Sequence, residues 1–350
     1  MRDILIGSRL INDESPAYVI AEIGNNHGGD VTVAAQMFKV AKDCGADAVK
    51  LQMRDNRNLY HRFMYDAPYV NRNSYGETYG KHREALELST YDYEALKQVA
   101  EDIGIDFFAT AFDIKSADTL GNILNMPAIK IASGGLTNTA LISYAADTGK
   151  PLIISTGGGS FEDIDRVVDL MIEMEVTQYA LLHCLASYPN QPSEINLNVI
   201  TTMRRRYRDI PIDFSCHYNG ICMAEGAFML GARIIEKHFT LNHTWKGTDR
   251  ALSLEPQGLK SLCQNLSRMY DALGDGNKVR HSSEDAPIRK MAQSVYCAKV
   301  IAIGDIIKTS QLKLQTPADG LPAWEIENIV GSKAIRIVEP DTLIGRQDYE

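Results

Sequence analysis

The chain has 350 residues, of which 45% are hydrophobic and 23% charged; this is the composition of an ordinary globular protein and excludes a disordered or fibrous chain. The formal net charge of −9 excludes a protein that binds nucleic acid through a general positive field. The length predicts a barrel of ~250 residues with a smaller appendage, and no segment approaches the ~18 apolar residues of a membrane span.

Short apolar runs rich in β-branched residues alternate with stretches of helical periodicity through most of the chain. Strands buried on both faces with helices between them are typical of a parallel sheet, and eight such units close a barrel. The predicted fold class is therefore α/β, a (β/α)8 TIM barrel over residues 1–275. The predicted strands span residues 18–23, 47–52, 106–111, 128–133, 151–156, 179–184, 212–217 and 233–238.

Three segments depart from this alternation. Residues 53–89 form a long excursion rich in Arg, Asn and Tyr, and in a barrel such a loop usually folds over the mouth of the active site. Residues 276–292 are polar and predict a linker. Residues 293–350 carry β-branched runs broken by turns, which predicts a small β-rich domain with a weak internal repeat.

Polar side chains stand at or just beyond the end of every predicted strand, where barrel active sites are assembled. Charged groups in a buried barrel are costly unless they are paired or bind a ligand. We therefore expect one polar cavity with a charged occupant. In chain order the strand ends carry Glu22; Lys50 and Gln52; Thr110 and Asp113; Lys130 and Ser133; Ser155 and Thr156; His183 and Tyr188; Ser215 and His217; Glu236 and His238.

Basic residues and hydroxyls in this set predict an anion site. Lys50 and Lys130, with Ser133, Ser155 and Ser215, are suited to hold a phosphate and a carboxylate. The alternative is a pair of lysines that only form structural ion pairs within the barrel.

Two histidines on neighbouring strands predict a metal site. His217 and His238 could place two imidazoles on one divalent cation and leave positions for water and substrate oxygens. The alternative is two unrelated, hydrogen-bonded histidines. Glu22 and Glu236 lie on adjacent strands of the ring, where carboxylates near a metal can serve as base, acid or support.

Six cysteines are spread along the chain without the spacing of metal ligands. A chain of this size does not need disulfides, so we expect reduced thiols and a cytoplasmic location. The N-terminal segment MRDILIGSRLIND has no apolar stretch of signal-peptide length.

Several stretches together resemble the sialic acid synthases, which condense phosphoenolpyruvate with an N-acylmannosamine. They are AEIGNNHGGD, GADAVKLQ, KIASGGLTN, LIISTG, LLHCLASYP, FSCHYNG, IEKHFTL and TWKGTDRALSLEP. The tail resembles the antifreeze-like (SAF) domain of that family. The resemblance covers essentially the whole chain.

The resemblance implies a role for each candidate residue and a second copy of the chain as partner. The metal polarises the open-chain aldehyde of the sugar, C3 of phosphoenolpyruvate attacks it, and water adds at C2 before phosphate leaves. The implied metal is Mn²⁺, with Mg²⁺ or Co²⁺ as alternatives, and the implied assembly is a homodimer in which the tail caps the partner's barrel. The predicted catalytic residues are Glu22, Lys130 and Glu236, the substrate-binding residues Lys50, Gln52, Ser133, Ser155, Tyr188, Ser215 and Asp249, and the metal ligands His217 and His238.

The identity of the sugar stays open because the chain departs from the family pattern at Gly135, Ala186, Cys216, Arg250 and Thr316. Residues 73–87 resemble the loop of animal-type synthases that use a 6-phosphorylated sugar. Lys81, His82 or Arg83 could meet that phosphate, or they could form a solvated helix start.

Two other functions remain possible from the sequence. One is a metal-independent Schiff-base aldolase of the N-acetylneuraminate lyase type that uses Lys130 or Lys50. The other is a carbohydrate-binding protein without catalysis.

Overall fold

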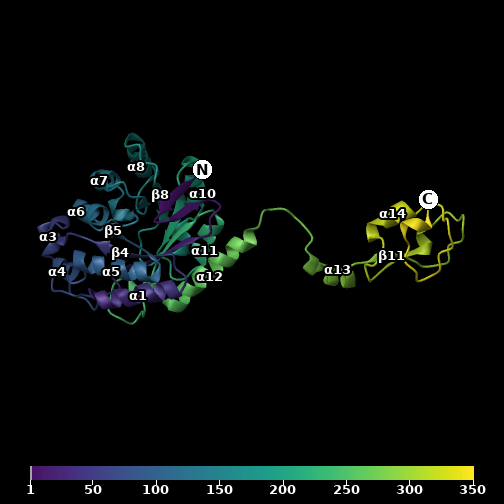
Figure 1. Ribbon diagram of the computed structural model, residues 1–350, viewed down its shortest axis with the longest axis horizontal. Helices are drawn as coiled ribbons and strands as arrows, with labels where there is room; N and C mark the ends of the chain where they lie inside the picture. The colour runs from purple at the N-terminus through teal and green to yellow at the C-terminus, as the bar shows by residue number, and fades with distance from the viewer. Residues whose placement is uncertain (1) are drawn as a thin grey trace. The chain divides into compact units, whose positions relative to one another are not determined.

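A computed structural model of the chain describes residues 2–350, and eight parallel strands close into a barrel in the first part of it (Figure 1). Each strand overlaps one of the predicted runs, so the prediction of a TIM barrel is confirmed. The strands are β3 (Tyr18–Gly24), β4 (Ala48–Met53), β5 (Asp106–Ala111), β6 (Ile129–Ile131), β7 (Leu152–Ser155), β8 (Tyr179–Cys184), β9 (Ile212–Cys216) and β10 (Ile234–His238).

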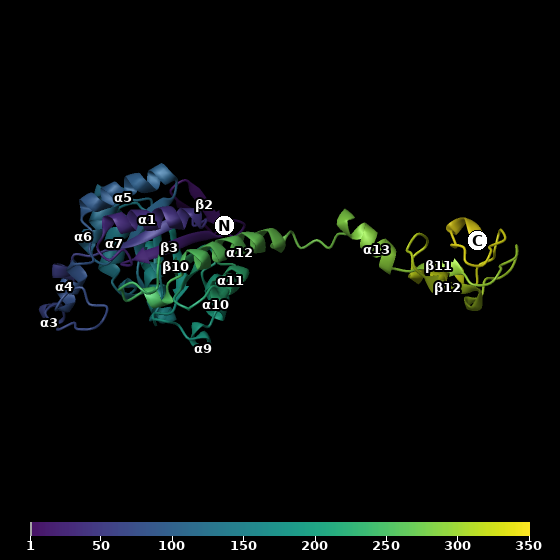
Figure 2. The same cartoon turned by 90° about the horizontal axis from the view of Figure 1, so that it is seen from below.

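A helix follows each barrel strand, and the two views show the helices arranged around the strands (Figures 1 and 2). The helix starts carry the expected caps; Ser160, for example, caps its helix in a reciprocal capping box with Asp163. The eight helices are α1 (Val31–Asp43), α5 (Thr90–Ile103), α6 (Ile114–Asp118), α7 (Thr139–Asp147), α8 (Phe161–Glu173), α10 (Asn198–Arg206), α11 (Cys222–Met229) and α12 (Pro256–Leu273).

The register of the barrel brings the predicted polar residues side by side. Glu22 on β3 pairs with Lys50 on β4, and Gln52 on β4 pairs with Thr110 on β5. Around the other side of the ring, Ser215 on β9 pairs with Glu236 on β10. Because neighbouring parallel strands carry paired residues on the same face, these side chains share the barrel interior.

A hairpin precedes the barrel and was not predicted. It consists of β1 (Asp3–Ile6) and β2 (Arg9–Asn12), and its Ile4, Ile6 and Ile11 side chains are buried in the barrel core. The Leu5 N–H donates to Gln178 Oε1 at 2.9 Å, just before β8. The hairpin therefore packs against the N-terminal ends of the strands, opposite the predicted site.

The excursion after β4 contains α2 (Asn56–Leu59), α3 (Arg62–Tyr65) and α4 (Tyr79–Glu84). Helices α3 and α4 lie beside each other (Figure 2). Tyr75 lies between α3 and α4 in the sequence. Its hydroxyl donates to the Lys246 carbonyl at 2.7 Å, so the excursion contacts the loop that follows β10. Shorter elements at the same end of the barrel are η2 (Ser133–Gly135), α9 (Pro192–Ile195) and η3 (Arg250–Leu252).

The chain divides into two compact units, Met1–Gly274 and Asp275–Glu350. The second unit contains the antiparallel pair β11 (Ser294–Cys297) and β12 (Leu312–Gln315) and the short helix α14 (Ile326–Ile329). It has an apolar core of its own, formed by Val295, Cys297, Ile301, Ile307, Leu312, Ile329, Ala334, Val338 and Ile344. The predicted linker carries the helical turn η4 (Ser282–Glu284) and the helix α13 (Asp285–Met291).

All six cysteines are free thiols. Across residues 2–350, every helix is too short or too polar to cross a bilayer.

Candidate active site

The C-terminal ends of the barrel strands line a polar cavity of about 320 Å³, part of which is open to solvent. All the predicted site residues except Asp249 line it, and the lining side chains come from all eight strands and their loops. The lining residues are Glu22, Lys50, Gln52, Thr110, Lys130, Ala132, Ser133, Ser155, Cys184, Tyr188, Ser215, His217, Glu236 and His238.

Lys50 forms a buried ion pair at the base of this cavity. Its Nζ lies 2.6 Å from Glu22 Oε2 and 3.6 Å from Glu236 Oε2, and it donates to Thr110 Oγ1 at 2.8 Å. Gln52 Nε2 donates to the other oxygen of Glu22 at 2.7 Å. Both charged partners are almost fully buried, and the ion pair offsets part of the large cost of burying each charge alone.

Lys130 forms the second half of the charge cluster. Its Nζ donates to Ser155 Oγ at 2.5 Å and lies 3.9 Å from Glu236 Oε1. The same carboxylate oxygen accepts from Ser215 Oγ at 2.9 Å. Two ammonium groups and two carboxylates thus balance each other, and an incoming anion could exchange places with the carboxylates as partner of the lysines.

The pKa values of the two carboxylates, Glu22 and Glu236, are shifted in opposite directions. Burial raises the pKa of Glu22, and the Lys50 ammonium offsets this only in part. Burial also acts to raise the pKa of Glu236, but Lys130, Lys50 and the Ser215 hydroxyl outweigh it and lower the pKa to about 2. When the environments of two neighbouring carboxyl groups shift their pKa values apart, one group can act as an acid and the other as a base.

His217 and His238 face each other across the mouth of the cavity, with ring centroids 5.3 Å apart. Burial lowers the pKa of His217 to about 4 and lowers that of His238, so both rings are neutral near pH 7, the form that binds metals. The ring nitrogen His217 Nδ1 lies 2.8 Å from the Leu185 carbonyl. A carbonyl partner makes Nδ1 the donor and leaves Nε2 free for a ligand.

This histidine pair fits a divalent cation. His238 Nδ1 is buried without a hydrogen-bond partner, which is costly in the absence of a ligand or water. Within residues 2–350, His, Cys, Asp and Glu side chains form no cluster of three with the geometry of a metal site. The remaining ligands of a cation here would therefore come from water and substrate oxygens.

Tyr188 and Asp249 lie nearer the opening. Tyr188 is 56% exposed, and its ring packs on His217 with a centroid distance of 4.1 Å. Asp249 does not line the cavity, but its carboxylate acts on His238, where it opposes the lowering of the pKa by burial. Of the two, Tyr188 lines the cavity.

Three strand-end residues point away from the cavity. His183 Nε2 lies 2.7 Å from the Ile195 carbonyl, and Asp113 caps α6 by accepting from Ser116 N at 2.8 Å. Thr156 Oγ1 donates to the Leu182 carbonyl at 3.0 Å. The expectation that all strand-end polar groups converge is wrong for these three, which satisfy backbone groups instead.

Apart from Ala132, two residues that line the cavity were assigned no role from the sequence. Thr110 was noted at its strand end, and its hydroxyl accepts from Lys50. Cys184 follows His183 on β8, and its Sγ lies 3.9 Å from His217 Nδ1. Successive side chains of β8 point to opposite faces, so Cys184 lies inside the barrel and His183 outside. The sequence reveals this only when the direction of one residue of the strand is known.

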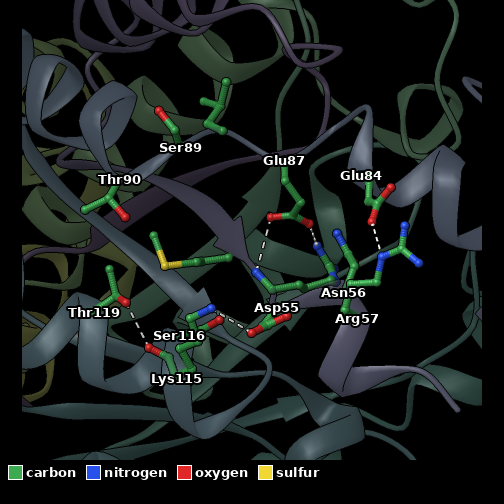
Figure 3. A pocket seen from close by; sticks show the side chains of 13 residues that line it. Asp55, Asn56, Arg57, Glu84, Glu87, Ser89, Thr90, Lys115, Ser116 and Thr119 are labelled. Atoms are coloured by element: carbon green, nitrogen blue, oxygen red, sulfur yellow. Dashed lines mark hydrogen bonds and ion pairs between the residues drawn. The ribbon is translucent and has the colours of Figure 1, made fainter.

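A larger cavity of about 900 Å³ lies beside the site, between α2, the start of α5 and α6 (Figure 3). Its charged side chains are paired with one another: Arg57 with Glu84 at 2.8 Å and Lys115 with Asp55 at 2.8 Å. It lacks the convergent strand-end groups, so we place the active site in the smaller cavity.

Comparison with known proteins identifies the family. The NeuB family model matches residues 37–278, which span most of the barrel. The chain belongs to the NeuB family. The resemblance to sialic acid synthases found in the sequence is thereby confirmed.

Named relatives of the family align over nearly the whole chain. The chain is 36% identical to N-acetylneuraminate-9-phosphate synthase of Homo sapiens over 341 residues, covering 97% of this chain and 94% of the relative. It is 33% identical to N,N'-diacetyllegionaminic acid synthase of Campylobacter jejuni, covering 93% and 98%. A crystal structure of N-acetylneuraminic acid synthetase from Leptospira borgpetersenii superposes with a TM-score of 0.71 at 32% identity, covering 82% of this chain and 95% of that one.

Proposed function

We propose that this protein is a nonulosonic acid synthase that condenses phosphoenolpyruvate with an N-acyl hexosamine, such as N-acetylmannosamine or its 6-phosphate, and releases phosphate. The observation that carries the proposal is the charge cluster of Lys50 and Lys130 beside the histidine pair, within one buried cavity. The relatives are named as synthases of sialic and legionaminic acids, which favours this condensation over a Schiff-base aldolase.

Phosphoenolpyruvate is assigned to the basic end of the cavity. Lys50 and Lys130 supply two buried ammonium groups, and Ser133, Ser155 and Ser215 supply hydroxyls around them. Charge-assisted hydrogen bonds of this kind are stronger than neutral ones and suit phosphate and carboxylate groups. When the ligand binds, the lysines exchange their glutamate partners for its oxygens.

The sugar is assigned to the outer part of the cavity, near Gln52, Tyr188 and Asp249. A divalent cation held by His217 and His238, with Mn²⁺ expected and Mg²⁺ or Co²⁺ as alternatives, would supply a Lewis acid for the aldehyde oxygen. C3 of the enolpyruvate forms the new bond to the aldehyde carbon, and water adds at C2 before the C–O bond to phosphate breaks.

The carboxylates are assigned to proton transfer. Glu22, whose pKa is raised by burial, is assigned to deliver a proton to the developing alkoxide. Glu236 stays ionised and, with Lys130, fixes the position of the enolpyruvate. Positioned groups that meet charge as it develops account for a large share of enzymatic rate enhancement.

The partner is proposed to be a second copy of this chain, with the tail acting as a SAF-type cap over the partner's barrel. The tail has its own core, so it can fold as a unit and serve as a cap. A cytoplasmic location is proposed from the six free thiols, which suit a reducing compartment.

The test is a phosphate-release assay with phosphoenolpyruvate and a panel of N-acyl hexosamines and their 6-phosphates. Release that needs both substrates and is lost with a chelator supports the proposal. Activity that survives the chelator, with borohydride trapping pyruvate on Lys130, would instead favour the aldolase.

A further inference from the structure

Two basic side chains at the outer edge of the site have no acidic partner. Arg83 on α4 is half-buried and donates to the Tyr79 hydroxyl at 3.1 Å. Lys246, in the loop after β10, places its Nζ 4.5 Å from the centroid of the Tyr75 ring. Among the described residues 2–350, neither cation has a carboxylate within ion-pair distance, so both are available to an anion.

The same contacts bring the two cations to one place. Tyr75 joins their segments, since its hydroxyl donates to the Lys246 carbonyl at 2.7 Å and its N–H donates to His82 Nδ1 at 3.0 Å. His82 precedes Arg83 on α4. Burial lowers the pKa of His82 to about 4, and the charges of Arg83 and Lys246 both lower it further. The two cations therefore flank a neutral histidine.

Arg83 is connected to the cavity through polar groups. Arg54 donates to Gln52 Oε1 at 2.5 Å, and the positive charges of Arg54 and Arg83 both act on the hydroxyl of Tyr79. Gln52 in turn holds Glu22. Arg54 thus contacts the cavity residue Gln52 and lies near Tyr79, the residue whose hydroxyl accepts from Arg83.

Asp249 lies close enough to Arg83 for its charge to act on the guanidinium. Burial acts to lower the pKa of Arg83, but Tyr79, Tyr60 and Asp249 outweigh it and raise the pKa. Asp249 and Gln52, which Arg54 contacts, are residues assigned above to the sugar.

Charge balance shows what this arrangement can accept. Inside the cavity two ammonium groups already face two carboxylates, and phosphoenolpyruvate takes up both lysines. A second phosphate on the sugar would need further cations, at the end of the sugar away from the aldehyde. We propose that Arg83 and Lys246 form a subsite for the phosphate of an N-acyl hexosamine 6-phosphate.

This subsite rests on the proposed function and specifies its substrate. Condensation adds the three carbons of phosphoenolpyruvate, so a phosphate on carbon 9 of a product stands on carbon 6 of the sugar. The human relative is named for a 9-phosphate product, whereas the Campylobacter jejuni relative is named for an unphosphorylated one. The unpaired cations favour the first kind of substrate for this chain.

The structure also narrows the hypothesis drawn from the sequence. His82 is buried and its pKa is lowered to about 4, so it brings no positive charge to a phosphate near pH 7. Lys81 is exposed, and its Nζ lies 3.8 Å from Glu77 Oε2. Arg83 remains, and Lys246 joins it from a distant part of the sequence. Arg250 supports the loop by donating to the Lys246 carbonyl at 2.9 Å.

The experiment compares N-acetylmannosamine with its 6-phosphate in the phosphate-release assay, for the full-length protein and three variants. For Arg83→Gln we expect KM for the 6-phosphate to rise about 10- to 100-fold, the usual effect of losing a hydrogen bond to a charged group. For the exposed Lys246→Met we expect a rise of about threefold to tenfold. KM for the unphosphorylated sugar should not change in either variant.

Lys81→Gln is the matched control, because it removes a neighbouring charge from the same helix; it should leave both KM values unchanged. Preference of the wild type for the unphosphorylated sugar would overturn the subsite while leaving the proposed function intact. An equal rise in KM for both sugars in Arg83→Gln and Lys246→Met would also overturn it. If Arg83→Gln does not fold, Lys246→Met decides the question alone. Absence of phosphate release with either sugar would contradict the proposed function itself.

Discussion

Replacing Lys130 by methionine removes one of the two buried ammonium groups while keeping a side chain of similar length. In the wild type, Glu236 lies 3.9 Å from Lys130 and 3.6 Å from Lys50, and Lys50 also pairs with Glu22 at 2.6 Å. The variant leaves one ammonium for two carboxylates, so the cavity carries a net negative charge and repels the anionic substrate.

The size of the effect follows from the loss of a positioned cation that faces a phosphate or carboxylate. Such losses cost about 3–4 kcal/mol of transition-state stabilisation, which lowers kcat/KM about 10²- to 10³-fold. Initial rates of phosphate release at varied phosphoenolpyruvate give kcat and KM separately. We expect much of the loss of Lys130→Met in KM for phosphoenolpyruvate, because the ground state already carries the charge.

Lys39→Met is the control, since Lys39 is an exposed lysine on α1 and its loss should leave both parameters unchanged. Addition of Glu236→Gln to Lys130→Met restores the charge balance and should recover part of the affinity for phosphoenolpyruvate. A Lys130→Met enzyme within about threefold of wild type, against the 10²-fold expected of a positioned cation, would refute the reasoning that this ammonium holds the substrate.

Three further predictions concern stability and assembly. Burial raises the pKa of Asp213 from 3.8 to about 6, so the folded state favours the protonated form and this contribution to stability is present below pH 3.8 and lost as the pH rises through 6. Urea unfolding should therefore show Asp213→Asn gaining about 3 kcal/mol relative to wild type between pH 4 and pH 7; a constant difference would contradict the shift. Phe38→Ala, which removes a buried ring 4.8 Å from that of Phe107, should lower the free energy of unfolding by about 3–5 kcal/mol, and a loss below about 1 kcal/mol would mean that the helix α1 interface is not part of the core. Deletion of residues 286–350 should reduce activity and dimer formation together, as measured by phosphate release and light scattering; a fully active monomer would refute the proposed cap.

The barrel could be predicted because eight apolar runs separated by helical stretches leave few other folds. The hairpin β1–β2 escaped prediction, since its two strands are four residues each and too short for a periodic pattern. Its register depends on contacts with distant residues such as Gln178, and such contacts cannot be seen from local sequence.

Within the site, the residue types were predictable and their directions were not. Strands of a parallel barrel are apolar on both faces, so the sequence of β8 does not reveal that Cys184 points inward and His183 outward. The same applies to α4, where His82 and Arg83 differ by one position and only packing against Tyr75 separates the buried ring from the available guanidinium. Lys246 lies far from both in the sequence, and only folding brings it near.

The central claim is that this cavity forms a carbon–carbon bond between phosphoenolpyruvate and an N-acyl hexosamine. Phosphoenolpyruvate labelled with ¹³C at C3, incubated with the enzyme, Mn²⁺ and the sugar, tests it most directly by NMR. We expect the labelled carbon to appear as a methylene joined to a carbinol carbon, with one phosphate released for each product. Label that remains in phosphoenolpyruvate with every sugar tested, or that appears only in pyruvate, would contradict it.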